Sequence, residues 1–362
     1  MGAEDIYLDI VAGWGGVWTA PVRGALALPA AVYGRIVERR NRGYDTGRRE
    51  VVRLPVPVIS IGNVTTGGTG KTPLVLDIAG RFLRRGRRPA VVARGYRAGH
   101  DGLADEPEMI SELLPGVPCV TNGDRVAGGH DAMKLGADVI VLDDGFQHRR
   151  IARDADFVVV DATNPFGFDH VLPRGLLREP IGGLRRATLF VISRCDQADA
   201  TTVEAIIGRL RVITPETPCV RSRHRPLGLH ALSGASSQDQ YDRAIVFAAI
   251  GNRRAFAHTV SRMGMTVAAE RWWPDHHAYR PQDIRALVRL RERVEHDVVI
   301  TTRKDAVKLR KLDVQPLEPL RVLDIEIEYL DGGDTVIDDH LGGVLDASRP
   351  SAAAEAPLRC SL

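Results

Sequence analysis

The sequence predicts an α/β fold in which a mostly parallel sheet is covered by helices on both faces. Short apolar runs rich in β-branched residues occur along most of the 362 residues, and segments with helical spacing separate several of them. Strands that are apolar along their whole length are typical of parallel sheets, because both of their faces are buried. In addition, one of these runs leads through a glycine-rich turn into a helical segment.

The expected elements follow in order along the chain. A helix is expected at 73–85, where Leu74, Ile78 and Phe82 recur at helical spacing. The segments expected to form strands are residues 56–61, 90–93, 139–143, 157–161, 189–193, 244–250 and 298–301. A polar stretch rich in glycine and serine predicts a boundary near 225–243. We therefore expect an N-terminal segment at 1–54, a core at 55–228, a smaller C-terminal α/β lobe at 229–345 and a loose tail at 346–362.

Composition excludes several classes of protein. The net charge is only +3, from 49 Lys and Arg against 46 Asp and Glu, so we expect no nucleic-acid partner. The 4 Cys form no CxxC pair, which argues against a disulfide framework and a zinc knuckle. A reducing cytoplasmic compartment is the simplest interpretation.

The N-terminus combines apolar and basic sequence. Residues 10–22 and 24–34 are largely apolar, but neither run reaches the roughly 18 residues of a spanning helix, and Pro21 and Pro29 are expected to interrupt any continuous helix. Residues 35–53 contain seven Arg and three acidic residues. Such a segment suits an anionic membrane surface. It equally suits a helix packed on the protein's own core with a solvated basic face, and the residues alone leave both interpretations open.

A glycine-rich loop is the strongest motif. In the sequence VPVISIGNVTTGGTGKTPLVL (56–76), an apolar strand leads into GGTGKT and then into a helix. Glycines let backbone N–H groups turn around phosphate oxygens, a lysine reaches the β- and γ-phosphates, and a Thr hydroxyl binds Mg²⁺. Thr65 stands where the strict motif has its first glycine. The residues expected to bind nucleotide are Thr66, Gly67, Gly68, Thr69, Gly70, Lys71 and Thr72.

Two adjacent acids follow another expected strand. Asp143 and Asp144 lie at the carboxyl end of residues 139–143, where α/β sheets present ligands and where a phosphate-loop enzyme keeps the acid that orders Mg²⁺. A solvated turn at the end of a strand is the alternative. His148 lies nearby, and a functional and an ordinary role are equally compatible with its position.

The phosphate acceptor is less evident from the residues. Residues 193–196 read SRCD and lack the Lys of the guanine-specific N/T-K-x-D motif, which disfavours a GTPase without excluding it. Asp105 and Glu106 lie in ADEPEMI, and His276 and His277 lie in WWPDHHAYRP. If these segments meet, Asp105 and His276 form a carboxylate–imidazole base that takes the proton of an alcohol acceptor. Each segment alone is also explained as a helix start or a loop cap.

Several segments together resemble one family, the tetraacyldisaccharide 4'-kinases that phosphorylate the lipid A precursor in Gram-negative bacteria. Besides the glycine-rich loop, the matching segments are VVARGYR (91–97), ADEPEMI (104–110), DVIVLDDGFQHRRIARD (138–154), LPRGLLREP (172–180), WPDHH (273–277) and TTRKDAVKL (301–309). They occur in the family's order between residues 55 and 310. In the last of them, Arg303 stands where the family commonly has an acidic residue.

The resemblance implies transfer of the ATP γ-phosphate to the 4'-hydroxyl of a tetraacylated glucosamine disaccharide 1-phosphate, giving lipid IVA. It implies a peripheral enzyme, expected to be monomeric, at the cytoplasmic face of the inner membrane, held there by its N-terminal segment. By position, Asp105 is the catalytic base with His276 as its partner, and Lys71 is the catalytic lysine of the loop. The implied Mg²⁺ ligands are Thr72, Asp143, Asp144 and Glu179, and the residues in matching motifs with less defined roles are Glu106, His148 and Arg94. Two alternatives stay open. One is a nucleotide-dependent switch resembling a GTP-using metallochaperone, and the other is an adaptor that only binds nucleotide.

Overall fold

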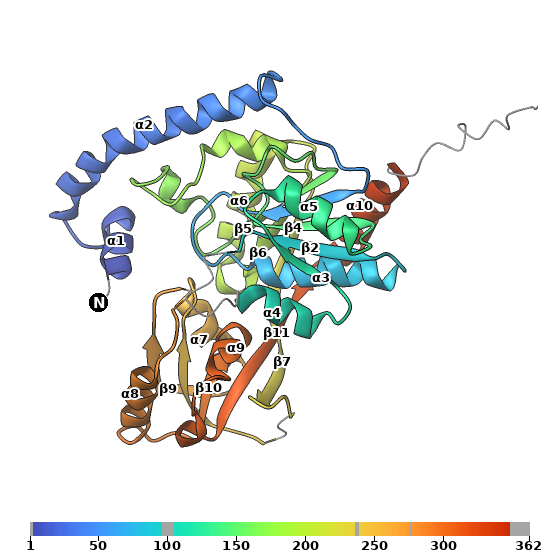
Figure 1. Cartoon of the computed structure of the whole chain (residues 1–362). Coiled ribbons are helices and arrows are strands. Elements are labelled where there is room, and N and C mark those ends of the chain that lie inside the picture. Colours follow the sequence, from blue (N-terminus) through green and yellow to red (C-terminus); the bar gives the residue numbers. More distant parts are fainter. Residues whose placement is uncertain (1–2, 96–104, 236–238, 276, 348–362) are drawn as a thin grey trace, which may run out of the picture.

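The computed structural model describes residues 3–95, 105–235, 239–275 and 277–347, with the backbone alone described at 3–5, 105 and 106. Its centre is one 11-stranded sheet in the order β3-β2-β4-β1-β5-β6-β7-β11-β10-β8-β9 (Figure 1). The core half contains β1 (Val58–Gly62), β2 (Pro89–Ala93), β3 (Cys119–Thr121), β4 (Val139–Asp143), β5 (Ala155–Asp161) and β6 (Leu189–Ser193). All of these pair in parallel. The expected mostly parallel α/β sheet is therefore confirmed.

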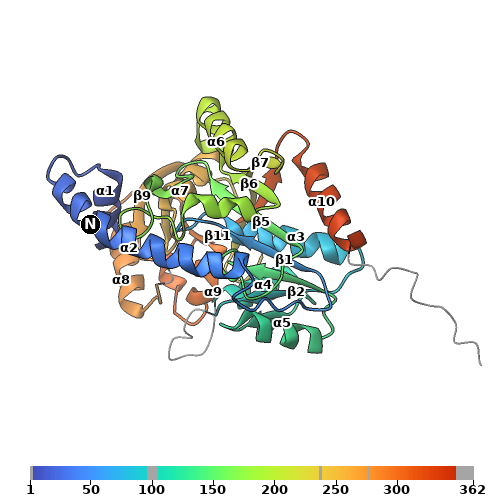
Figure 2. The same cartoon turned by 90° about the horizontal axis from the view of Figure 1, so that it is seen from above.

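Helices cover both faces of the core half, as the wholly buried strands require (Figure 2). Ile59, Val141 and Val159 face one side, where they pack with α3 (Lys71–Arg84) and α4 (Asp105–Leu113). Ile140 and Val160 face the other side, which α5 (Arg125–Lys134) and α6 (Ala200–Ile213) cover. Because these strands run parallel, their carboxyl ends lie at one edge of the sheet.

Two long strands join the halves of the sheet. β7 (Cys219–Ala231) and β11 (Leu320–Tyr329) pair antiparallel, whereas the other pairings among the described strands are parallel. Neither strand is evident from the sequence, because charged residues at their outward positions interrupt the apolar pattern. Across the pair, Arg223 lies 2.8 Å from Glu328, and Arg225 also pairs with Glu326. Opposite charges facing each other across strands stabilise such a ribbon.

The C-terminal lobe continues the sheet beyond this ribbon. It contains β8 (Arg243–Ala248), β9 (Thr266–Trp272) and β10 (Val298–Thr302), with α7 (Arg253–Arg262), α8 (Pro281–Arg291) and α9 (Arg303–Leu309). The strands expected at 244–250 and 298–301 correspond to β8 and β10, whereas β3 and β9 were not predicted. β3 is only 3 residues long, and β9 is mostly half-buried or exposed, so neither has a clear apolar run.

The N-terminal segment forms two helices, α1 (Ala3–Ala12) and α2 (Thr19–Asp45). The prediction that Pro21 and Pro29 interrupt the helix is wrong, because α2 runs through both for 27 residues. Pro21 lies in the first turn, where a missing N–H costs nothing, and the helix tolerates Pro29 on its exposed side. In the described part of the chain, no helix combines the length and the apolar character that crossing a bilayer requires.

The last helix returns to the core. α10 (Gly333–Ala347) buries Ile337 and Leu341 in the same apolar cluster as α3, and Arg81 of α3 lies 2.8 Å from Asp338. The expected boundaries therefore differ from the structure at two points. The division at 228/229 falls inside β7, and α10 packs on the core although it was assigned to the C-terminal lobe.

Truncating Leu341 tests whether α10 is part of the core. Leu341 is fully buried, so Leu341→Ala is expected to lower the free energy of unfolding by about 2–5 kcal/mol. Val336 on the same helix is 38% exposed, and Val336→Ala is expected to change it by less than about 1 kcal/mol. Urea unfolding of the two variants measures the difference, and equal small losses would contradict the assignment.

Candidate active site

The glycine-rich loop connects β1 to α3, as the sequence predicted. Gly67 and Gly70 have φ values of 104° and 89°, in the left-handed region that favours glycine. A Cβ on Gly70 would also lie 2.9 Å from Nε2 of His224. Both conformation and space therefore require glycine at position 70, directly before the Lys71 that begins α3.

Lys71 is held between two oxygen-bearing side chains. Its Nζ lies 3.2 Å from Oδ1 of Asn63 and 3.4 Å from Oδ1 of Asp144. Asn63 is fully buried, and its amide donates to the Thr65 carbonyl at 2.8 Å and to the Thr69 hydroxyl at 3.1 Å. The loop thus orients its own lysine before any phosphate arrives.

Asp143 and Asp144 lie at the carboxyl end of β4, beside β1. Asp144 adopts a φ of 52°, and its carboxylate accepts two hydrogen bonds from Arg178, at 2.6 and 2.8 Å. Burial opposes ionisation of Asp144, but Lys71 and Arg178 outweigh it and lower its pKa to about 2. Asp144 is therefore a carboxylate at neutral pH, next to the phosphate loop.

Basic groups surround the other side of this acid pair. Arg125 is buried, donates to the Asp143 carbonyl at 3.1 Å and has a pKa lowered by burial. Burial lowers the pKa of His148 to about 4, and the charges of Arg125 and Arg94 act in the same direction. Arg94 is exposed at the end of β2. His148 is accordingly neutral at pH 7, in a region of positive potential.

Glu179 does not join the acids in a metal site of three protein carboxylates. It is fully buried, and its oxygens accept from Arg186, Asn41 and Gln147, each at 2.9 Å. Among the described residues, no group of three or more His, Cys, Asp or Glu side chains is placed to hold a metal ion. Because Asn41 belongs to α2 and the other two donors belong to the core, Glu179 links α2 to the core through hydrogen bonds. Its role as a Mg²⁺ ligand stays a prediction.

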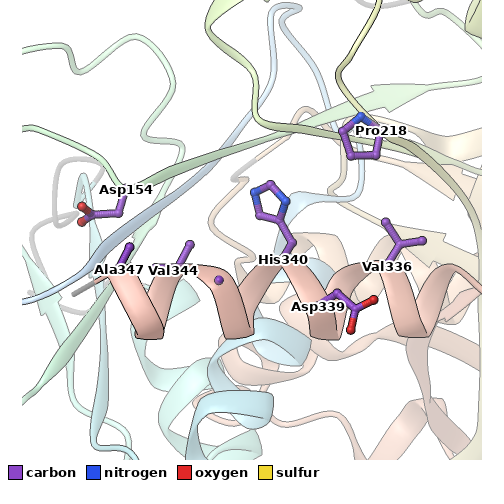
Figure 3. Close-up of a pocket in the computed structure, with 8 residues that line it drawn as sticks. Asp154, Pro218, Val336, Asp339, His340, Val344 and Ala347 are labelled. Carbon is purple, nitrogen blue, oxygen red and sulfur yellow. The ribbon is translucent and has the colours of Figure 1, made fainter. Parts of the chain in front are cut away.

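A cavity of about 950 Å³ opens beside the phosphate loop. It lies between the core and the C-terminal lobe, and its lining includes Thr66–Thr69, Asp161, Asp196–Gln197, Gly251–Asn252 and Trp14. A second pocket of about 570 Å³ lies along α10, with His340 and Pro218 on its wall (Figure 3). Asp154 and Pro218 precede β5 and β7, so this pocket lies at the opposite edge of the sheet and contains none of the predicted site residues.

Similarity to known proteins shows which family the chain belongs to. A family model of tetraacyldisaccharide-1-P 4'-kinases matches residues 23–342. The chain belongs to this family. A tetraacyldisaccharide 4'-kinase of Anaeromyxobacter sp. (strain K) is 40% identical over 360 residues, covering 93% of this chain and 90% of that protein. One of Syntrophus aciditrophicus (strain SB) is 38% identical over 317 residues, covering 80% and 84%.

A solved structure supports the same assignment. The crystal structure of LpxK from Aquifex aeolicus in complex with ATP aligns with a TM-score of 0.66 and 25% identity, covering 89% of this chain and 99% of that one. The resemblance seen in the sequence is confirmed. So is the activity it implied, a kinase that phosphorylates a tetraacyldisaccharide 1-phosphate at its 4'-hydroxyl in lipid A biosynthesis. The membership does not support the alternative of a guanine-nucleotide switch.

The structure describes only part of the predicted base of this kinase. His276 lies outside the described residues, and the backbone alone places Asp105 and Glu106 at the start of α4. α4 packs against α9 of the C-terminal lobe (Figure 1). Lys304 of α9 lies 3.3 Å from Asp275, the neighbour of His276. The two predicted segments thus approach the same helix from opposite lobes.

The other residues of those motifs have structural partners. His277 lies 3.0 Å from Asp283 and stacks on Trp273, which makes it part of the lobe's packing. Arg303, which departs from the family pattern, donates to Asp324 of β11 at 2.8 Å. The departure thus replaces a local acidic group by an ion pair within the lobe.

Sequence reasoning missed several residues that contact the loop or its acids. Asn63 and Arg178 lie inside recognised motifs, in GNVTTGG and in LREP, so their positions give some signal. Arg125 lies in no recognised motif. Ser193 and Arg194 belong to SRCD, whose sequence indicates only that the guanine-specific lysine is missing, yet they contact the phosphate loop at the Thr69 and Gly68 carbonyls.

His224 lies directly behind the loop. It is 8% exposed on β7, its Nε2 has no hydrogen-bond partner among the described residues, and burial lowers its pKa to about 3, with Arg194 adding to the effect. An unfolded chain would bind a proton at this histidine below pH 6.5, whereas the folded chain does not. This histidine therefore stabilises the fold less and less as the pH falls from about 6.5 towards 3.

Replacing His224 by Asn tests this linkage. When the pH is lowered from 7 to 5, His224 is expected to lower the free energy of unfolding by about 2 kcal/mol. His224→Asn is expected to flatten the pH dependence by that amount, because it removes the titrating group. Urea unfolding at the two pH values measures it, and an unchanged decline in the variant would contradict a buried neutral histidine.

Proposed function

We propose that the phosphate loop binds MgATP and that the γ-phosphate passes to an acceptor sugar lying between α4 and the C-terminal lobe. The placement of Lys71 supports this most directly. The lysine is oriented by Asn63 and Asp144 at the carboxyl edge of the sheet, next to the cavity that extends towards Asn252 of the lobe. Lys71 and the loop amides would stabilise the charge on the transferring phosphoryl group.

The residues around Lys71 fit a Mg²⁺ ion. Mg²⁺ prefers oxygen ligands and commonly uses one or two carboxylates together with substrate phosphates. The ionised Asp144, the neighbouring Asp143 and the hydroxyl of Thr72 in the first turn of α3 would hold it. Held by these residues, Mg²⁺ would supply electrostatic stabilisation of the negatively charged phosphate groups.

Asp105 would take the proton of the 4'-hydroxyl, with His276 as its partner. An alcohol does not ionise at neutral pH, so a positioned base is needed as the phosphoryl group arrives. Two observations support this pairing, namely the packing of α4 on α9 and the ion pair between Lys304 and Asp275. Glu106 would act beside Asp105 at the same end of α4.

Arg94 and His148 would line the path of the phosphorylated head group. Arg94 follows β2, next in the sheet to the strand that carries Asp143, and its charge is among those that act on Arg125 and His148. A neutral His148 donates or accepts a hydrogen bond without adding repulsion to these arginines. Arg94 would contact a phosphate group of the nucleotide or of the disaccharide.

The N-terminal helices would place the enzyme on the membrane surface, at the cytoplasmic face of the inner membrane. Val17 and Trp18, which directly precede α2, are 92% and 60% exposed, and Leu28 and Ile36 of α2 are 74% and 63% exposed. Arg35 and Arg39 of α2 are also exposed. The opposite face of α2 packs on the core, where Tyr33 donates to the Arg178 carbonyl at 2.7 Å. An apolar face with flanking arginines suits a bilayer of anionic lipids.

Asp105→Ala and His276→Ala test the proposed base. Each is expected to lower turnover by about 10²- to 10⁴-fold while ATP affinity stays within about twofold, because general base catalysis acts only on the chemical step. Transfer of label from ATP to the tetraacyldisaccharide 1-phosphate in detergent micelles measures turnover. His277→Asn is the matched control and is expected to retain activity, since His277 is bonded to Asp283. Near-normal lipid phosphorylation by either Ala variant would refute the assignment.

Trp18→Ser combined with Leu28→Ser tests the membrane face. Burying two large apolar side chains is worth about 3 kcal/mol or more, so the double variant is expected to bind vesicles containing anionic phospholipid at least tenfold more weakly. Co-sedimentation with the vesicles measures binding, which should also weaken at high salt. Val212→Ser on α6, where Val212 is 85% exposed, is the control. Equal losses in both proteins would contradict the proposed face.

A further inference from the structure

Ser193, the last residue of β6, and Arg194, which follows it, hold two carbonyl groups of the phosphate loop. The Ser193 hydroxyl donates to the Thr69 carbonyl at 2.8 Å, and the Arg194 guanidinium donates to the Gly68 carbonyl at 2.7 Å. Ser193 and Arg194 are 1% and 5% exposed. Two successive carbonyls of the loop are therefore fixed from one side by groups that are themselves immobilised.

Fixing these carbonyls also fixes two amides. In a trans peptide the C=O and the following N–H point in opposite directions, and the cis bonds of the described chain lie elsewhere, at Pro173 and Pro319. The N–H groups of Thr69 and Gly70 consequently point away from Arg194 and Ser193. Neither amide has a hydrogen-bond acceptor within the described residues. Both are available to phosphate oxygens.

Arg194 is itself held by the end of the neighbouring strand. Its backbone is left-handed, with φ 58°, and its guanidinium pairs with Asp161 at the end of β5. Asp161 also accepts from the backbone N–H and the hydroxyl of Thr163, at 3.0 and 2.7 Å. If the Arg194 guanidinium moved away from the Gly68 carbonyl, the buried carboxylate of Asp161 would lose its counter-charge, which is energetically costly.

The C-terminal lobe contacts the preceding peptide group of the loop, between Gly67 and Gly68. A Cβ on Gly251 would lie 2.5 Å from the Gly68 nitrogen, so the two backbones are in close contact. Asn252 caps α7 with its side-chain oxygen, 3.0 Å from the Ala255 nitrogen, and its amide nitrogen lies 3.4 Å from Asp161. The lobe thus reaches the loop through Gly251 and through the acid that anchors Arg194.

We propose that Ser193 and Arg194 are positioning residues that orient the Thr69 and Gly70 amides of the phosphate loop towards the triphosphate. The SRCD segment lacks the lysine that recognises a guanine nucleobase. In this protein the segment therefore positions the phosphate loop and does not contact a nucleobase. The inference rests on the proposed binding of ATP at this loop. Preorganised Thr69 and Gly70 amides strengthen binding of the β- and γ-phosphates. They contribute little to the binding of nucleotides that lack these phosphates.

Arg194→Lys and Ser193→Ala test the inference, with Arg153→Lys as the matched control. Arg153 pairs with Asp156 at 3.0 Å at the opposite end of β5, where both side chains are 9% and 8% exposed. Loss of one oriented hydrogen bond is expected to weaken ATP binding about tenfold for Arg194→Lys and about threefold for Ser193→Ala. AMP affinity and the KM for the lipid should change less than about twofold in both.

Calorimetric titration with ATP and AMP and steady-state kinetics supply these values. A merely structural role would lower the active fraction, and therefore kcat, while leaving the KM for ATP unchanged. Wild-type ATP affinity in both variants, or an equal loss of ATP affinity in Arg153→Lys, overturns the inference. Equal losses for ATP and AMP overturn it as well. Failure of the wild-type protein to bind ATP would instead refute the proposed function.

Discussion

Parallel pairing of β1 with β4 and β5 is the constraint on which the site depends. Carboxyl ends of neighbouring parallel strands meet at one edge, so the phosphate loop after β1 lies next to Asp144, which follows β4, and Asp161, the last residue of β5. The 3.4 Å contact between Lys71 and Asp144 follows from this register. Without it, the lysine would lack its counter-charge and the loop its orientation.

The continuous sheet explains how two lobes contribute to one reaction. β7 and β11 carry the chain out of the core and back, and α10 then packs beside α3. The C-terminal lobe is therefore attached at both of its ends, close to the helix that begins with Lys71. Gly251 touches the phosphate loop, and α9 packs against α4, which begins with Asp105. The phosphate loop and the helix that begins with the proposed base are both in contact with this lobe.

Burial separates the titrating groups of the site into two sets. Asp144 stays ionised because Lys71 and Arg178 outweigh the cost of removing its charge from water. His148 and His224 stay neutral because burial and nearby arginines oppose a further positive charge. Both imidazoles are thus neutral at pH 7 and add no positive charge to that of Lys71 and the nearby arginines.

The sequence determined the α/β class, the strands with wholly apolar runs, the glycine-rich loop and the acid pair after β4, because burial on both faces and phosphate chemistry leave local signatures. β7 and β11 escaped detection since their charges are neutralised only across the strand pair. The tertiary structure alone decided the contacts of Arg194 and Arg178, the partners of Glu179 and the return of α10. Each joins residues distant in sequence, and no local pattern encodes which distant group a buried charge will meet.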